Sequence, residues 1–211
     1  MKKIKLLVLC LFAFCMLRAQ DDTNTKVREL GVYSSSLTSG YGITCKFGTP
    51  DLLWVVRGSF TGSIPFNKDS VTYQQFGMPQ TIYINSSTNL LLGLTFGFEK
   101  YHTIKEKLFA YYGAVLSYSY QYIQNKDLLF YKNSTITNTP GIGIRFGLKY
   151  AISKHFNVAV DITPTFTYSN TKYSYNENPT LPAQSYSYSY NISSLNFSLF
   201  NTAVFTLTYR F

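Results

Sequence analysis

Cysteine, histidine and tryptophan are scarce in this sequence, with three, two and one residue among 211. If a leader is removed after Ala19, Cys45 is the one cysteine left, which excludes a fold stabilised by an intramolecular disulfide. No Ser-His-Asp order, no His/Cys cluster with metal-ligand spacing and no glycine-rich phosphate loop occurs in the sequence. We therefore expect neither an enzyme nor a cofactor or metal site.

Charged residues and long apolar runs are also few. Only 14% of the residues are charged, and the formal net charge is +9. Four of the nineteen basic residues lie within residues 1–19, so the rest of the chain has fifteen basic against ten acidic residues, or +5. This excess forms no basic cluster, which argues against nucleic acid as a partner. Beyond residue 19 no apolar run approaches the ~20 residues of a spanning helix, so a membrane crossing must use strands.

The N-terminus has the three parts of a secretory signal peptide: a basic start, an apolar run over residues 4–17, and the small Ala19 at a plausible cleavage point. A transmembrane anchor is disfavoured because the run is shorter than a spanning helix. A lipoprotein is disfavoured because large residues precede Cys10 and Cys15. We predict a cleaved signal peptide, a short N-terminal segment and one barrel domain over residues 1–19, 20–27 and 28–211, respectively.

Strict alternation of apolar and polar residues dominates the chain after residue 28. Near the C-terminus, Phe205 and Leu207 take odd positions, while Thr206 and Thr208 take even ones. A period of two sends the two sets to opposite faces of a sheet. We interpret eight segments as strands, at about residues 28–36, 40–48, 52–62, 90–98, 108–122, 142–150, 156–168 and 195–211.

The connections between these segments alternate in length. The short ones, at about residues 48–51, 102–106 and 152–155, fall on one end of the sheet. The other end has a short connection at 37–39 and long polar ones at 63–85, 123–139 and 170–191. Outer-membrane barrels combine short periplasmic turns with long external loops in this way. The sequence therefore predicts an all-β fold, an eight-stranded antiparallel up-and-down transmembrane β-barrel.

The volume of the side chains decides which face lies inside. An eight-stranded barrel has an interior just wide enough for side chains to fill. The apolar face carries large Phe, Tyr, Leu and Ile side chains, which would overfill it, whereas the polar face is rich in Gly, Ser, Thr and Ala. A soluble, lipocalin-like barrel is thus disfavoured, and lipid is the expected solvent of the apolar face.

Charged residues with the parity of the inner face are expected to pair, because an isolated charge in a narrow lumen is costly. They are Glu29, Lys46, Arg57, Glu99, Arg145, Lys149, Asp161 and Arg210. We predict a plug in which Arg57 and Arg145 meet Glu99 and Asp161. A narrow ion conduit is the alternative, whereas an open solute pore is disfavoured at this strand number.

Aromatic residues lie near both ends of the predicted strands, as expected of girdles at the two bilayer interfaces. They are Tyr41, Trp54, Tyr118, Tyr120, Tyr150, Tyr168, Tyr209 and Phe211. Ten residues back from Phe211, the polar Asn201 is expected at the outer interface.

The eight alternating segments and the terminal residues 206–211, TLTYRF, resemble those of the OmpA/OmpX-type family of small outer-membrane barrels over residues 28–211. The resemblance implies the outer membrane of a diderm bacterium, contact with its lipid and lipopolysaccharide, and recognition of Phe211 by the barrel assembly machinery. Lipid A-modifying enzymes on this scaffold place a histidine near the outer leaflet. His102 and His155 fall in predicted periplasmic turns, so this activity is disfavoured.

The last long connection contains a group of tyrosines in a Ser/Asn-rich setting: Tyr173, Tyr175, Tyr186, Tyr188 and Tyr190. This composition favours adaptable binding of a partner, and strand extension beyond the bilayer is the alternative. The last three have the inward parity of the final strand, so only a bulge near Asn191 would turn them outward. We expect a structural, adhesive or partner-binding barrel that acts through external loops. An accessory barrel in secretion or surface assembly, with a periplasmic protein partner, and a narrow channel are the other hypotheses.

Overall fold

The computed structural model describes residues 26–34, 40–63, 69–75, 78–84, 86–127, 131–177, 187–199 and 203–211. Their secondary structure consists of strands: β1 (Val27–Ser34), β2 (Tyr41–Gly48), β3 (Leu52–Ser63), β4 (Asp69–Gln75), β5 (Met78–Ile84), β6 (Ser86–Lys105), β7 (Leu108–Asp127), β8 (Tyr131–Ala151), β9 (Phe156–Ile162), β10 (Thr165–Glu177), β11 (Ser187–Ser198) and β12 (Val204–Arg210). Within these ranges, no helix is long and apolar enough to cross a membrane. The predicted signal peptide and Asn201 lie outside the described residues.

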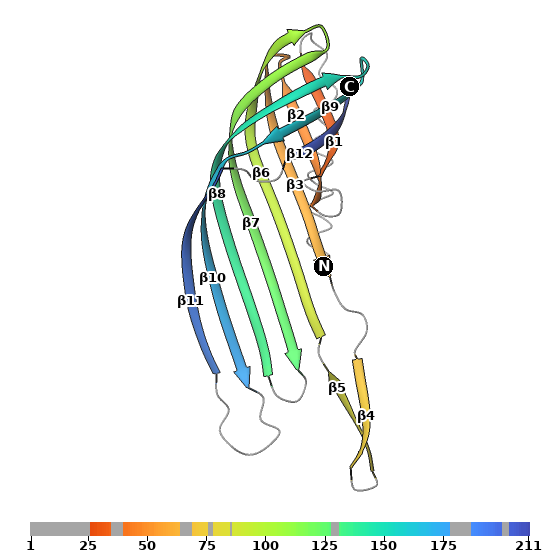
Figure 1. Ribbon diagram of the computed structural model, residues 1–211, viewed down its shortest axis with the longest axis vertical. Helices are drawn as coiled ribbons and strands as arrows, with labels where there is room; N and C mark the ends of the chain where they lie inside the picture. The colour runs from red at the N-terminus through yellow and green to blue at the C-terminus, as the bar shows by residue number, and fades with distance from the viewer. Residues whose placement is uncertain are drawn as a thin grey trace.

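Eight of the strands close into a ring. Its order is β1-β2-β3-β6-β7-β8-β9-β12, with β12 pairing back onto β1, and every pairing is antiparallel. Successive ring members are neighbours along the chain apart from the β4–β5 and β10–β11 hairpins, which project from one end (Figure 1). The predicted eight-stranded antiparallel up-and-down barrel is therefore confirmed.

The last two predicted strands are each divided into two pieces. The segment 156–168 is interrupted between Ile162 and Thr165, and 195–211 is interrupted between Ser198 and Val204. Pro164 lies at the first interruption, where it has no N–H to donate to a neighbouring strand. Its carbonyl still accepts a hydrogen bond from the N–H of Ile144 at 3.1 Å. β9 and β10 therefore pair with β8 in the same register on both sides of the interruption.

The second interruption introduces two extra residues. Asp161 pairs with Val204, and Thr165 pairs with Ser198. The chain therefore advances four residues from Asp161 to Thr165, while the opposite segment advances six residues from Ser198 to Val204. Because two is an even number, the inner and outer faces are preserved across the interruption. From Thr165 to Asn176 the β10–β11 register is unbroken. The bulge near Asn191 that would have turned the last tyrosines outward is therefore absent from this described pairing.

Two predicted loops and one predicted turn are mostly strand. The prediction of a loop at 123–139 is wrong, because β7 runs to Asp127 and β8 starts at Tyr131. The loop at 170–191 is wrong for the same reason, since β10 and β11 occupy most of it, and the segment 63–85 contains the β4–β5 hairpin. The turn at 102–106 is also shorter than predicted, because β6 continues to Lys105. Alternating Ser, Thr, Asn and Tyr residues form strands without the apolar face on which the prediction depended.

Short connections gather at one end of the barrel, called here the turn end, which also holds the C-terminus (Figure 1). Thr49 closes the first of these connections, with its N–H donating to the carbonyl of Leu52 at 3.0 Å. At residues 152–155, the Ser153 hydroxyl accepts hydrogen bonds from the N–H groups of His155 and Phe156 at 3.2 and 3.1 Å. Beyond the opposite end of the ring, the strands β6, β7, β8, β10 and β11 continue as an open curved sheet (Figure 1).

Side chains alternate between a mainly polar interior, which also holds the apolar Leu53, Val55 and Val115, and an apolar exterior. Arg57, Glu99, Arg145 and Asp161 are buried, whereas Leu116, Ile142 and other large apolar side chains lie exposed on the outside. This is the reverse of a water-soluble protein, in which apolar residues are inside. The alternation therefore gives the closed ring an apolar outer surface on all its strands, which lipid can cover.

Candidate functional site

A cluster of buried charges fills the barrel near the turn end. Arg57 donates to both carboxylate oxygens of Asp161 at 3.1 and 2.7 Å, in a two-bonded arrangement that is stronger than a single contact. Arg145 donates to Glu99 at 3.0 Å, and its Nε lies 3.6 Å from Asp161. Lys46 donates to the other oxygen of Glu99 at 2.6 Å. These side chains, which we call the first plug, come from β2, β3, β6, β8 and β9 and join those strands across the lumen.

A second cluster lies closer to the turn end around Glu29. Its carboxylate accepts hydrogen bonds from Lys149, from Arg210 at 3.1 and 3.2 Å, and from Thr208 at 3.1 Å. Asn157 donates to the same carboxylate at 3.3 Å. Arg210 is the partly exposed member, with 36% of its side chain accessible. We call this group the second plug.

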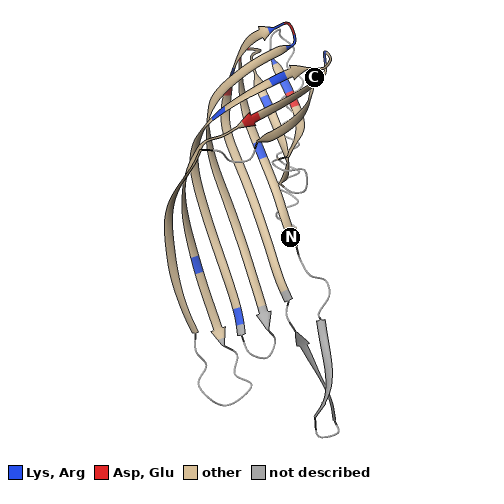
Figure 2. Ribbon diagram, viewed as in Figure 1, with Lys and Arg blue, Asp and Glu red and all other residues tan. Residues whose placement is uncertain are grey.

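All the charged residues that the sequence assigned to the lumen belong to one of the two plugs. Arg57 and Arg145 both contact Glu99 and Asp161, with Arg57 and Glu99 the most distant pair at 3.8 Å. Figure 2 shows that the coloured charges gather around the turn end, whereas the far part of the long strands is almost free of them.

Two tyrosines of the plugs have no counterpart in the sequence-based assignment. The hydroxyl of Tyr101 donates to Glu99 at 2.5 Å and accepts from Lys46 at 3.2 Å, and the hydroxyl of Tyr111 donates to Asp161 at 3.0 Å. Their two rings lie 5.1 Å apart. Continuing the alternation of β6 past residue 98 would have placed Tyr101 on the face of Glu99. The prediction of a turn at 102–106 interrupted that reasoning.

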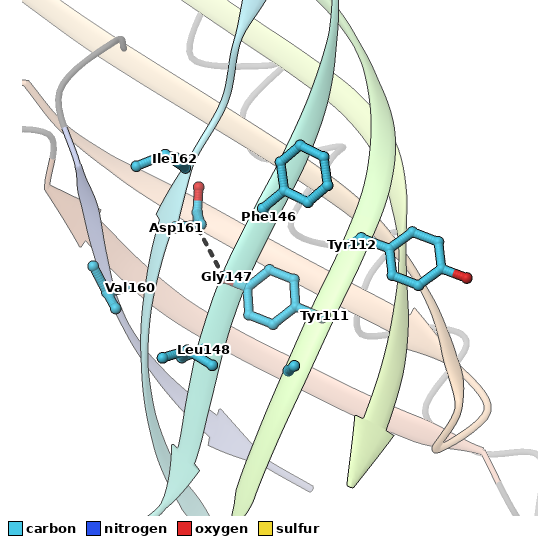
Figure 3. A pocket seen from close by; sticks show the side chains of 9 residues that line it. Tyr111, Tyr112, Phe146, Gly147, Leu148, Val160, Asp161 and Ile162 are labelled. Atoms are coloured by element: carbon cyan, nitrogen blue, oxygen red, sulfur yellow. Dashed lines mark hydrogen bonds between the residues drawn. The ribbon is translucent and has the colours of Figure 1, made fainter. Parts of the chain in front are cut away.

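Tyr111 lies flat against the barrel wall because Gly147 has no side chain. A Cβ added at Gly147 would come within 2.3 Å of the Tyr111 ring and 2.5 Å of its hydroxyl oxygen. The outer side of this thin wall is a depression of about 490 Å³, bordered by Tyr112, Phe146 and Leu148 (Figure 3). The depression is bordered mainly by outward apolar side chains, so it belongs to the lipid-facing surface.

The proposed girdle residues occupy the outer face. Near the turn end, Trp54 stacks on Phe96 at 5.5 Å, and Tyr209 contacts Phe211 at 5.1 Å. At the other level, Tyr118 and Tyr168 are exposed on the outer face of β7 and β10. Of the remaining members, Tyr41 and Tyr150 are exposed and Tyr120 is half-buried.

Beyond Tyr118 and Tyr168, the strands of the open sheet continue with few charges as a region that we call the sheet extension. We define it as residues 86–93, 119–127, 131–139, 169–177 and 187–194. Its tyrosines from the predicted loop pair across strands: Tyr173 stacks on Tyr190 at 4.9 Å and Tyr175 on Tyr188 at 5.1 Å. Tyr186 lies outside the described residues.

Neither histidine approaches the sheet extension. His102 lies in β6, in place of the predicted turn, and stacks on Tyr112 at 5.7 Å. His155 lies in the connection at 152–155 and stacks on Tyr209 at 5.5 Å. Among the residues that the structure describes, no group of three His, Cys, Asp or Glu side chains is arranged to hold a metal ion.

A closed strand ring with ion pairs inside and large apolar side chains outside defines an inside-out barrel of the outer-membrane type. No protein-family model matches the sequence, and no curated protein matches it by sequence. Three solved structures are similar to the chain at low identity. A major outer membrane protein from Thermus thermophilus has 11% identity and a TM-score of 0.44, with 89% of this chain and 98% of that chain covered.

Two further structures resemble the chain more remotely. The Pseudomonas putida toluene transporter TodX has 9% identity and a TM-score of 0.30, over 90% of this chain and 68% of that chain. Acinetobacter baumannii CarO has 11% identity and a TM-score of 0.31, over 90% and 97%. Since these similarities are all remote, the fold is assigned from the strand pairing and the polarity of the two faces.

Proposed function

We propose that this chain is a non-enzymatic barrel of the outer membrane that conducts no solutes and acts by binding through its sheet extension. The observation that carries the proposal is the contrast between a lumen crossed by ion pairs and a sparsely charged extension beyond it. Aqueous pores need many more strands, and the side chains of eight strands suffice to fill the lumen. A binding role is therefore better supported than transport of solutes.

The location in an outer membrane rests on the aromatic and apolar exterior. A strand tilted by ~40° crosses the ~25 Å apolar band in about ten residues. Counted from Tyr150 on β8, this distance ends near Pro140, whose partner on β7 is Tyr118. The sheet extension then lies outside the cell, and the turn end lies in the periplasm. As the OmpA/OmpX-type resemblance implies, the outward Phe211 would be read by the barrel assembly machinery.

Two measurements on the full chain test this function. The folded barrel should migrate faster in SDS gels when unboiled than when boiled, and planar-bilayer recordings should show no stepwise conductance. In cells, a cysteine placed at Lys132 in the sheet extension should react with a membrane-impermeant maleimide. A cysteine at Lys154 in the turn end should react only after the outer membrane is permeabilised. The reverse labelling pattern, or large stable conductance steps, would overturn the proposal.

A narrow anion conduit is the second candidate, because the plugs contain more cations than anions. Lys46, Arg57, Arg145, Lys149 and Arg210 face only Glu29, Glu99 and Asp161. Among the described residues, the Nε atoms of Arg57 and Arg145 are buried without a hydrogen-bond partner. Small chloride-selective currents that vanish in Arg145→Ala would favour this function over a closed plug.

A further inference from the structure

The inner face of the sheet extension carries four stacked tyrosine rings. On β10, buried Thr165 and exposed Phe166 define the inner and outer parities, and Tyr173 and Tyr175 have the parity of Thr165. Tyr190 and Tyr188 lie directly opposite them on β11 and therefore point to the same side. Tyr188 and Tyr190 also stack on one another at 6.3 Å. Together the four side chains, which we call the tyrosine ladder, make a continuous aromatic surface.

This surface is open to solvent. Tyr188 and Tyr190 are 59% and 48% exposed, although tyrosine rings in a filled interior would be covered. Rings in the lumen behave differently: Tyr101 and Tyr111 are buried, and their hydroxyls are bound to carboxylates. The tyrosine ladder thus presents ring surface that the fold leaves available for a ligand.

Hydroxyl groups surround the ladder on the same face. Thr137 and Thr171 lie within hydrogen-bond distance at 3.1 Å, as do Thr139 and Ser169, on the inner side of β8 and β10. Ser194 and Asn196 continue the row on β11. Lys172 is the one charged residue among the side chains described on β10 and β11, and its parity is that of the outer face. The inner side chains described on these two strands are therefore uncharged, and all are polar or aromatic apart from Ile192, which lies opposite Thr171.

We propose that the tyrosine ladder binds a neutral polysaccharide of the surrounding medium. Such a chain is uncharged, offers hydroxyl groups as donors and acceptors, and has apolar C–H faces that fit flat aromatic rings. The ring face of tyrosine is electron-rich and its edge is not, so stacking selects these weakly positive C–H groups. Tyrosine combined with Ser and Asn adapts to such mixed surfaces at little cost in conformational entropy. An anionic glycan would find no cation among the described inner side chains of β10 and β11. The inference rests on the proposed function, because it requires the extension to lie outside the cell.

The experiment is affinity electrophoresis of the full, folded chain through native gels that contain a polysaccharide. Lauryldimethylamine oxide keeps the barrel in solution, since maltoside or glucoside detergents would offer competing sugar. Dextran, starch, mannan and laminarin are the neutral probes, and heparin and purified lipopolysaccharide are the anionic ones. We expect retardation by at least one neutral polysaccharide and by neither anionic probe.

Variants then assign the binding to the ladder. Tyr173→Ala/Tyr190→Ala removes one complete stack and should weaken binding about tenfold or more. Tyr190→Phe keeps the ring and should stay within about twofold. Tyr122→Ala, a tyrosine on the outer face of β7 in the extension, is the matched control and should bind as the parent does. If the double variant loses heat-modifiability, Tyr188→Ser is used instead, with several-fold weaker binding expected.

Several outcomes would overturn the inference. They are no retardation by any neutral polysaccharide, retardation by heparin or lipopolysaccharide alone, and an equal loss of binding in Tyr122→Ala. A parent chain that is heat-modifiable, non-conducting and labelled at its extension, yet binds no polysaccharide, would remove this inference and leave the proposed function standing. Failed labelling of the extension would instead remove the proposed function first.

Discussion

The turn-end half of the barrel and the sheet extension share strands but have opposite chemistry inside. In the ring, the inner side chains of β8 include Arg145 and Lys149, which are buried and paired with carboxylates. Farther along the same strand, the inner side chains are Thr137 and Thr139, which lie within hydrogen-bond distance of other hydroxyls. One strand therefore contributes to a rigid, charged interior at one end and to an open, uncharged face at the other. The comparison indicates that stability depends on one part of these strands and recognition on another part of the same strands.

The largest effect is expected on removal of Glu99, because three cations surround it. Glu99→Ala would leave Lys46 and Arg145 without their closest buried anion. Breaking a buried ion pair in this way costs about 3–5 kcal/mol. Urea unfolding of the barrel in lipid vesicles, followed by the fluorescence of the single Trp54, measures the loss. Lys132→Ala in the extension is the control and should change stability by less than about 0.5 kcal/mol. Equal stability of the two variants would abolish the distinction between the two halves.

A smaller but sharper effect is expected from a double-mutant cycle on Arg57 and Asp161. Each single alanine leaves the other charge buried without its closest partner, since Arg57 keeps only Glu99 at 3.8 Å and Asp161 keeps only Arg145 at 3.6 Å as an ion pair. The double variant leaves neither charge. The two side chains should therefore be coupled by about 1–3 kcal/mol, with the double variant more stable than the sum of the singles predicts. The same unfolding assay measures all four proteins. Additive losses would mean that the two charges are stabilised separately, by water or by other partners.

Gly147→Ala tests how closely the plug fits the wall. Its Cβ would overlap the Tyr111 ring, so the ring must move and its hydrogen bond to Asp161 must lengthen. Overpacking of this kind costs about 1–3 kcal/mol. At Gly58, a Cβ meets nothing within 4 Å, and Gly58→Ala should be close to neutral in the same assay. Similar losses for both variants would show that backbone freedom, and not contact with Tyr111, determines the effect.

The smallest effect on stability is expected in the tyrosine ladder. Tyr188→Ala removes one cross-strand pair with Tyr175 on an exposed face, which is worth about 0.2–1 kcal/mol. The urea midpoint should therefore move little, even though the same position matters for binding. A loss as large as that of Glu99→Ala would make the ladder part of the folding core and would end its separation from the plugs.

Alternation alone was sufficient to predict the ring and the inward parity of its charges. A strand in a barrel repeats every two residues, so Lys46, Arg57 and Glu99 could be placed on one side without any knowledge of contacts. The partners of each charge depend on register, which alternation does not determine. Tyr101 was missed for a different reason, because the predicted turn at 102–106 ended the alternation of its strand too early. The length of β7 and β8 was also underestimated, because their far parts lack an apolar face. The interruption near Pro164 could have been expected from its missing N–H, but the two extra residues between Ser198 and Val204 have no local signal.

Those two extra residues have an evolutionary consequence. Insertions of even length at this joint leave every later residue on its original side, so the part beyond can be lengthened, shortened or exchanged as a module. An insertion of one residue would expose the tyrosines to the outside and place Phe197 within. We expect related chains to differ by even numbers at this joint, with the ring beneath unchanged.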